Sequence, residues 1–251
     1  MIGTRSPRSE AEPREAIGPR SRWFADLHVH TSASFDSLAA PRSVVRAAAS
    51  RGLTHLAITD HDRIEGALEA REIAAREESG LTIIVGQEIR TRDGDLIGVF
   101  LERPIPSGLD AREAIAEVRA QGGLVGLPHP FDRFRGSLLN DDRMDVIAPL
   151  VDWVESHNAR ILVGNGNQKA AAFAAEHGLP GVAVSDAHSV MEIGVAYVAL
   201  AGDPSTADGL RTALPTAELV TGRATFFVRA VTPLAKLVQR ARGNGRMASV
   251  Q

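Results

Sequence analysis

Short apolar runs alternate with helix-like segments along most of the chain. Runs of this length that are apolar throughout, rather than at every second position, are typical of strands in a covered or closed sheet. Eight such runs predict strands, at residues 24–30, 53–60, 81–88, 95–102, 124–128, 151–158, 182–188 and 194–202. The sequence RDG at residues 92–94 predicts a turn before the fourth strand.

The segments between these runs have the composition of helices. Helices are predicted at residues 42–52, 64–80, 110–123, 167–181, 203–217 and 231–243. Asp110 is the expected N-cap of the third helix, because its carboxylate can accept hydrogen bonds from free backbone N–H groups. Gly52 is the expected C-cap of the first. The repeated alternation favours parallel strands joined by helical crossovers.

Alternation of strands and helices leaves two architectures open. A closed α/β barrel and an open doubly wound sheet both contain parallel strands covered by helices. A G-x-G-x-x-G sequence after the first strand would indicate a dinucleotide-binding sheet. The first predicted strand is followed instead by TSASFDS, residues 31–37, which contains no glycine. The sequence therefore gives no support to a dinucleotide cofactor.

The composition is that of an ordinary globular chain. The 251 residues are 44% hydrophobic and 24% charged. The formal net charge of −3 does not provide the positive charge that nonspecific nucleic-acid binding requires. Residues 1–22 predict a disordered tail, residues 23–240 one folded domain, and residues 241–251 a second tail. No apolar run approaches the roughly 20 residues of a membrane span. The first residues lack the apolar segment of a secretory signal, so the expected compartment is the cytoplasm.

Potential metal ligands lie at the ends of six predicted strands. The chain has no cysteine, so any metal must be bound by His, Asp or Glu. The strand-end residues are His28, His30, Asp60, His61, Asp62, Glu88, His129, Glu155, His157, Asn158, Asp186 and His188. The carboxyl ends of parallel strands converge on one face of an α/β fold. We therefore expect these residues to meet at one place.

Nine residues form the candidate ligand set. They are His28, His30, Asp36, His61, Glu88, His129, His157, Asp186 and His188. Imidazole and carboxylate without thiolate suit divalent ions such as Zn, Mn or Fe. Nine ligands exceed the roughly four to six that one ion takes, so two or three divalent ions are the expected cofactors. The remaining histidines, His55 and His177, are predicted to be structural.

Other polar residues lie next to the candidate ligands. Glu155 is two residues before His157 and is expected to share its strand face, as a support for a ligand or as an ordinary strand residue. Asp60 and Asp62 flank His61. Hydrogen bonds from such neighbours commonly orient metal ligands, and that role is expected for both aspartates.

Five motifs, in this order along the chain, resemble those of a known superfamily. DLHVHTSAS, AITDHD, GQE, PHPFD and SDAH are similar to motifs of the polymerase and histidinol phosphatase (PHP) superfamily of metal-dependent phosphoesterases. The resemblance extends from Ala25 to Val195 and is to the shorter, single-domain members. It implies a distorted seven-stranded α/β barrel with three divalent metals at the carboxyl ends of the strands.

Carried over by motif, the resemblance implies how the ligands divide among three ions. One ion would be bound by His28, His30, Glu88 and Asp186. A second would share Glu88 and add His129 and His157. A third would be bound by Asp36, His61 and His188. Some members have histidine at the position of Asp36, a difference that would weaken or retune the third site.

The activity implied by the resemblance is hydrolysis of a phosphoric ester. The nucleophile would be a hydroxide that bridges two metals, because metal binding lowers the pKa of water toward neutrality. Glu88 and His129 would be catalytic residues through those metals. Arg133 and Arg135 would hold the phosphate by bidentate contacts, with Arg160 as the next candidate. The expected substrate is a small phosphomonoester, a nucleotide or a short oligonucleotide, with no membrane partner.

Two other classes of protein stay open. An amidohydrolase-type metal enzyme also begins with His-x-His on its first strand and has a late aspartate. The TDH sequence at a strand end, and Glu88 where a bridging lysine is often expected, argue against that class. A noncatalytic metal-binding or regulatory domain is the third class, and the complete ligand set argues against it. The sequence does not fix the substrate, the metal or the oligomeric state.

Overall fold

The structure is a computed structural model that describes residues 22–132 and 141–246. Residues 1–21 of the first predicted tail and residues 247–251 of the second fall outside the described residues, as do Arg133 and Arg135. Within the described ranges, no helix is both long enough and apolar enough to cross a membrane.

One sheet runs through the described part of the chain and contains nine strands. They are β1 Trp23–Val29, β2 His55–Ile58, β3 Thr82–Arg90, β4 Asp95–Val99, β5 Leu124–Leu127, β6 Trp153–Asn158, β7 Gly181–Val184, β8 Tyr197–Leu200 and β9 Glu218–Val220. Their order is β7-β6-β5-β4-β3-β2-β1-β8-β9. The predicted count of seven strands is wrong in this detail, because β8 and β9 extend the sheet beyond β1.

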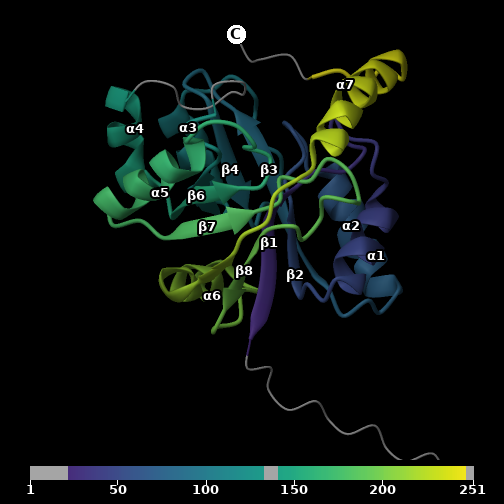
Figure 1. The fold of residues 1–251 in the computed structure, drawn as a ribbon, viewed down its shortest axis with the longest axis horizontal. Coiled ribbons are helices and arrows are strands. Elements are labelled where there is room, and N and C mark those ends of the chain that lie inside the picture. The colour runs from purple at the N-terminus through teal and green to yellow at the C-terminus, as the bar shows by residue number, and fades with distance from the viewer. Residues whose placement is uncertain (1–21, 133–140, 247–251) are drawn as a thin grey trace, which may run out of the picture.

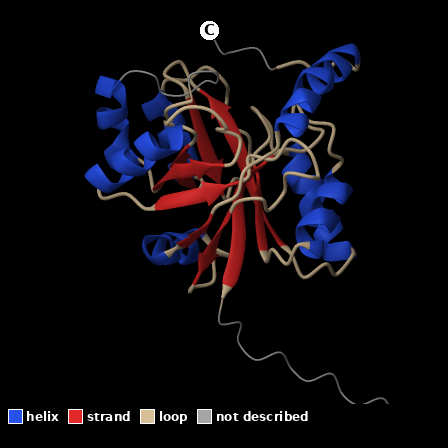
Figure 2. Cartoon of the chain, viewed as in Figure 1, coloured by secondary structure: helices blue, strands red, loops and turns tan. Residues whose placement is uncertain are grey.

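The sheet curls until its two ends almost meet (Figure 2), which selects the barrel over the open doubly wound sheet. Pairing is parallel from β1 to β3 and from β5 to β7, whereas β4, β8 and β9 run antiparallel to their neighbours. Val29 and Ala187 form an isolated parallel bridge across the remaining opening, and the His30 N–H donates to the Ala187 carbonyl at 2.8 Å.

Seven α-helices lie in the described ranges: α1 Pro41–Ser50, α2 Glu65–Arg76, α3 Ala111–Ala120, α4 Asp141–Ile147, α5 Gly166–Glu176, α6 Ala207–Ala213 and α7 Phe226–Ala241. Short 3-10 turns follow α4 at Ala148–Leu150 and α6 at Leu214–Thr216. In Figure 1, α1 and α2 lie on one side of the barrel and α3, α4 and α5 on the other. Helix α7 lies at the end of the barrel where β1 finishes (Figure 1).

The predicted N-cap of α3 is confirmed, whereas the C-cap of α1 is Arg51 and the predicted Gly52 is the residue after it. The Asp110 carboxylate accepts from the Glu113 N–H, and the Glu113 side chain accepts from the Asp110 N–H, which together form a capping box. Gly52 follows the last turn of α1 with φ of +77°, a conformation that glycine adopts without steric cost. Helix α4 was not predicted, because its sequence DDRMDVI is short and mostly polar.

Two hydrophobic layers hold the barrel together. The larger packs the helices onto the outside of the sheet, with buried residues such as Val44, Ile73 and Val118. The smaller includes Ile84 of β3 and Trp153 of β6. Ile84 shares a strand face with Glu88, and Trp153 shares one with Glu155, because alternate residues of a strand point the same way. The inner face of the barrel is therefore apolar at one end and charged at the carboxyl ends of its strands.

Replacing Gly126 with alanine is expected to reduce the free energy of unfolding by about 1–3 kcal/mol, the usual cost of overpacking a core. A Cβ atom on Gly126 would lie 2.2 Å from Cε2 of the Trp153 indole, which is buried and paired beside it. Denaturant unfolding measures the change. Gly245→Ala is the matched control, because a methyl there would meet no atom within 4 Å. Equal stability of the two variants would contradict this account of the packing.

Candidate metal centre

The structure brings together all the predicted ligands except His157, at the carboxyl ends of the strands. Glu88 of β3 is the residue that connects them. Its Oε2 atom lies 3.3 Å from Nε2 of His28, 3.3 Å from Nε2 of His30 and 3.3 Å from Nδ1 of His61. Its Oε1 atom lies 3.3 Å from Nε2 of His129. A single buried carboxylate at the end of β3 therefore contacts ligands that come from three other strand ends.

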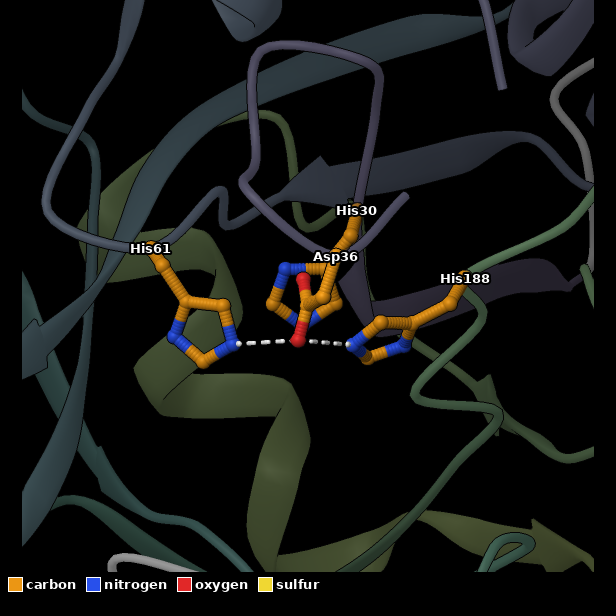
Figure 3. Close-up of side chains that lie close together, drawn as sticks. All are labelled: His30, Asp36, His61 and His188. Carbon is orange, nitrogen blue, oxygen red and sulfur yellow. Dashed lines mark ion pairs between the residues drawn. The ribbon is translucent and has the colours of Figure 1, made fainter. Parts of the chain in front are cut away.

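Figure 3 shows the first of two groups of ligands around this carboxylate, formed by His30, Asp36, His61 and His188. Oδ2 of Asp36 lies 3.3 Å from Nε2 of His61 and 3.3 Å from Nε2 of His188. One ligand atom from each residue lies within 4.8 Å of the others. The group combines the end of β1, the loop after it, the end of β2 and the segment after β7.

The second group consists of His28, His30 and Asp186, whose ligand atoms also lie within 4.8 Å of one another. Oδ1 of Asp186 is 3.7 Å from Nε2 of His28 and 3.6 Å from Nε2 of His30. His30 belongs to both groups, so the two clusters are adjacent. All three side chains are completely buried.

The donor set fits divalent metal ions. Nε2 of His28 and Nε2 of His30 face each other at 2.9 Å, and both also face the Glu88 carboxylate. Ring nitrogens and carboxylate oxygens that converge without thiolate are the ligands of Zn, Mn and Fe sites. Burial of several carboxylates at one point is costly unless cations compensate their charge. The chemistry of the cluster thus supports the predicted metals.

His157 does not join the cluster, and the strand face that it was expected to share with Glu155 does not form. Its Nε2 atom lies 2.7 Å from the Gly222 carbonyl and its Nδ1 atom 3.5 Å from Nδ2 of Asn167. The pairing of β6 with β7 shifts register between Glu155 and His157. Such a bulge adds a residue to one strand, so the two side chains no longer alternate in the ordinary way.

Glu155 takes the interior position instead and lies behind the ligands. Oε1 is 2.6 Å from Nδ1 of His28, and Oε2 accepts from the His129 N–H at 3.0 Å. Asn158 donates to Oε2 of Glu155 and to Oδ2 of Asp186, each at 2.9 Å. A carboxylate on Nδ1 of a histidine fixes the ring so that Nε2 is directed at the metal. The sequence had left this supporting role open for Glu155.

Asp60 and Asp62 hold backbone next to the ligands, and neither forms the direct contact with a ligand side chain that was expected. Asp60 accepts from both the N–H and the hydroxyl of Thr31 at 2.6 Å. Asp62 accepts from the Arg90 N–H at 3.0 Å. Asp60 therefore fixes the start of the loop that follows His30, and Asp62 fixes the end of β3.

Burial and opposite charges shift the pKa values of the cluster in different directions. Burial lowers the pKa of His28, but Glu155 and Glu88 outweigh it and raise this pKa to about 10. Burial also opposes the charge of His61, and Glu88 with Asp36 raises its pKa to about 9. Burial lowers the pKa of His30 to about 3. In the metal-free chain His28 and His61 therefore carry protons at neutral pH, and His30 does not.

Metal loading near neutral pH is expected to release about two protons per chain, because ligating imidazoles must be neutral. The protons come from His28 and His61, whose pKa values lie at about 10 and about 9 in the metal-free chain. A pH indicator in weakly buffered solution measures the release during titration with Zn²⁺ or Mn²⁺. His61→Ala is expected to release about one proton fewer. Metal binding without proton release would contradict this protonation state.

A cavity of about 420 Å³ opens onto the cluster. Its lining is Phe35, Asp36, His61, Glu88, Asp95, His129, Arg160, Asp186, His188, Thr232, Pro233, Lys236 and Arg246. Three of these residues bring positive charge to the ligands. Arg160 is buried, donates to Oγ1 of Thr232 at 2.7 Å and lies with Nε 3.5 Å from Oε1 of Glu192. Lys236 and Arg246 come from the chain after the last strand, where the sequence predicted a helix and a tail but no site residue.

Asp95 is a further cavity residue that the sequence analysis missed. It is buried at the start of β4, and burial together with Glu88 raises its pKa to about 6. Ligands were predicted only at the carboxyl ends of strands. Strand β4 runs antiparallel to β3, so its first residue lies at the same edge of the sheet as the ends of the parallel strands. The predicted RDG turn was the signal that could have identified it.

Fold and site together define a metal-binding α/β barrel protein. Residues 26–116 match the PHP domain family and residues 164–218 match the PHP-associated family. An uncharacterized protein of Methanocaldococcus jannaschii is 35% identical over 176 residues, which are 69% of this chain and 68% of that protein. The chain belongs to the PHP family, as the motifs predicted.

Other similar proteins include enzymes that are named for nucleic acids. A 5′-3′ exoribonuclease of Haemophilus influenzae is 35% identical over 119 residues, 43% of this chain and 42% of that enzyme. A two-domain protein of Bacteroides vulgatus, described as containing a predicted PHP-like metal-dependent phosphoesterase, superposes with a TM-score of 0.68 at 19% identity and covers 85% of this chain and 70% of that one. A lesion-specific endonuclease of Pyrococcus furiosus superposes with a TM-score of 0.60 at 18% identity. The superposition covers 79% of this chain and 57% of that one. The two solved structures show that the barrel fold is shared.

Proposed function

We propose that the protein is a metal-dependent phosphoesterase that hydrolyses a small phosphomonoester, a nucleotide or a short oligonucleotide. The observation that carries this proposal is the cavity itself. Buried His and carboxylate ligands gather around Glu88 in it, and Arg160, Lys236 and Arg246 line it as well. Metal ligands and cations that face one space are suited to a phosphate group and its developing negative charge.

Two or three divalent ions, Zn, Mn or Fe, would be held by this set of ligands. His28, His30, Glu88 and Asp186 would hold one ion. His30, Asp36, His61 and His188 would hold another. A further ion would be bound by Glu88 and His129, with Asp95 in the place that was predicted for His157. When bound, such ions supply a water of lowered pKa as nucleophile and neutralise phosphate charge.

The chain's own residues would orient the ligands and the substrate. Glu155 keeps Nε2 of His28 directed into the cluster through its contact with Nδ1. Arg160 is buried between Glu192 and Thr232, so its guanidinium loses little conformational freedom on binding a phosphate. With Arg133 and Arg135 outside the described residues, Arg160 is the best supported phosphate ligand of the three predicted arginines.

The size of the cavity and the named relatives favour a nucleotide-like substrate. A cavity of about 420 Å³ is within the usual range for small-molecule sites. Relatives named for exoribonuclease activity support phosphodiester or nucleotide substrates here. The net charge of −3 gives no general attraction for long polyanions, which favours a mononucleotide or a short oligonucleotide.

The first experiment combines metal analysis and activity on one preparation purified without added metal. Elemental analysis gives the ions per chain, and phosphate release is measured with nucleotides, sugar phosphates, p-nitrophenyl phosphate and bis-p-nitrophenyl phosphate, with chelator controls. Two or three ions with chelator-sensitive release support the proposal. Ions without turnover of any phosphate ester, together with turnover of an amide or nucleobase panel, would assign the chain to the amidohydrolase-type class. Ions with no turnover of either panel would favour a binding role.

A further inference from the structure

The loop that carries Asp36 is held from outside by the last described part of the chain. Gln239 of α7 is almost completely buried, with 2% of its surface exposed. Its Nε2 atom lies 2.7 Å from the Ser32 carbonyl, 3.1 Å from the Ser34 carbonyl and 2.7 Å from the Ser37 carbonyl. A primary amide has only two N–H donors, so three converging acceptors use them completely.

Three further residues at this end of the chain contact the same loop or the cavity beside it. Asn244 donates to the Ser32 and Ala33 carbonyls at 3.2 and 3.1 Å. Nζ of Lys236 and Cζ of Arg246 each lie 5.4 Å from the centre of the Phe35 ring. We call Lys236, Gln239, Asn244 and Arg246 the C-terminal clasp.

The loop's own hydrogen bonds explain why the clasp matters for the ligands. Ser34 Oγ donates to Oδ1 of Asp36 at 3.0 Å and lies 3.4 Å from Nδ1 of His30. The position of this turn therefore sets two ligands of the group in Figure 3. The carbonyls of the turn are directed at Gln239, and an unpaired buried carbonyl is costly. Without the Gln239 amide, the turn would have to rearrange to satisfy them.

We propose that Gln239 is a positioning residue for Asp36, and that the C-terminal clasp thereby sets the affinity of the ion bound by His30, Asp36, His61 and His188. This inference rests on the metal centre of the proposed function. The clasp lies outside both segments that match the PHP families, residues 26–116 and 164–218. The full ligand geometry thus depends on a part of the chain that those matches do not include.

Gln239→Glu tests the inference, because glutamate keeps the shape of the side chain and removes both N–H donors. Gln168→Glu is the matched control, with the same substitution at an exposed position of α5. Mn²⁺ and Zn²⁺ affinities are measured on metal-free proteins by competition with a chromophoric chelator. We expect one ion per chain to bind about 10–100-fold more weakly in Gln239→Glu, the usual effect of residues behind ligands. We expect the other ions, and all ions of Gln168→Glu, to keep their affinities.

Hydrogen exchange supplies a readout that does not involve the metal. Amides of residues 31–37 are expected to exchange faster in metal-free Gln239→Glu than in the Gln168→Glu control. A variant with lower thermal stability but unchanged ion affinities would overturn the inference and leave Gln239 a purely structural residue. If Gln239→Glu does not fold, Asn244→Asp removes the neighbouring pair of bonds and is expected to weaken the same ion.

The outcomes separate this inference from the proposed function. An unmodified chain that binds ions but hydrolyses no phosphate ester would overturn the proposed function, while the comparison of ion affinities would still decide the role of Gln239. An unmodified chain that binds no ion after reconstitution with Mn²⁺, Zn²⁺ or Fe²⁺ would overturn both.

Discussion

Replacing Glu88 with alanine is expected to reduce phosphate release by more than about 100-fold and to lower the number of ions per chain. Residues that only support metal ligands typically cost 10–100-fold in affinity or activity, and a shared ligand should cost more. Glu88 faces His28, His30 and His61 with one oxygen and His129 with the other. Its loss removes the carboxylate that both halves of the cluster share.

The measurement is elemental analysis and turnover on the same samples of the unmodified and variant chains. Glu69→Ala is the control, because Glu69 is exposed on α2. His129→Ala is expected to have a similar effect to Glu88→Ala, since Nε2 of His129 contacts Oε1 of Glu88. Full metal content and full turnover in either variant would show that the ions do not bind at these residues.

Removing the metals is expected to lower the midpoint of thermal unfolding by about 8–16 °C. This is the shift for one ion, since a single ion that binds only the folded chain stabilises it by about 4 kcal/mol when present at 1,000 times its dissociation constant, and each further ion adds to it. In a chain of this size, about 1 kcal/mol corresponds to roughly 2–4 °C. Without the ions, Asp36, Glu88 and Asp186 remain buried among imidazoles with no metal to balance them.

Thermal unfolding followed by circular dichroism, with and without chelator, measures this shift. Restoring Mn²⁺ or Zn²⁺ in excess is expected to restore the original midpoint. The Glu88→Ala chain provides the control, because its midpoint should respond much less to chelator. Equal midpoints for the loaded and stripped unmodified chain would be incompatible with a metal centre that is coupled to folding.

The barrel itself was predictable because each of its parallel strands has two recognisable signals in the sequence. Each combines an apolar run with a polar residue at its end, and such ends converge whatever the details of the fold. His28, His61 and Glu88 were predicted in this way. In the structure, a ring nitrogen of each histidine lies 3.3 Å from Oε2 of Glu88. The family resemblance added the closed form of the sheet, which alternation alone had left undecided.

The errors have local physical causes that composition and spacing do not reveal. The register shift in β6 places Glu155 behind the metal ligands and His157 away from them. A prediction that assumes strict alternation along a strand does not include such a bulge. Asp95 was not predicted because β4 is antiparallel to its neighbours, so its first residue and not its last lies at the site. The role of Gln239 could not be predicted from the sequence for another reason. Its partners are backbone carbonyls of Ser32, Ser34 and Ser37, and such bonds leave no pattern in side-chain types.

The narrow opening of the barrel has a consequence for how the site is assembled during synthesis. The opening lies between β1 and the segment after β7, where Val29 meets Ala187. The proposed ligands on its two sides, His28 and His30 on one and Asp186 and His188 on the other, are therefore made at very different times by the ribosome. A nascent chain cannot complete either group of ligands until the second pair emerges. Capture of the full set of ions therefore waits for residues 186–188, and the bound ions would connect β1 with the segment after β7 across the opening.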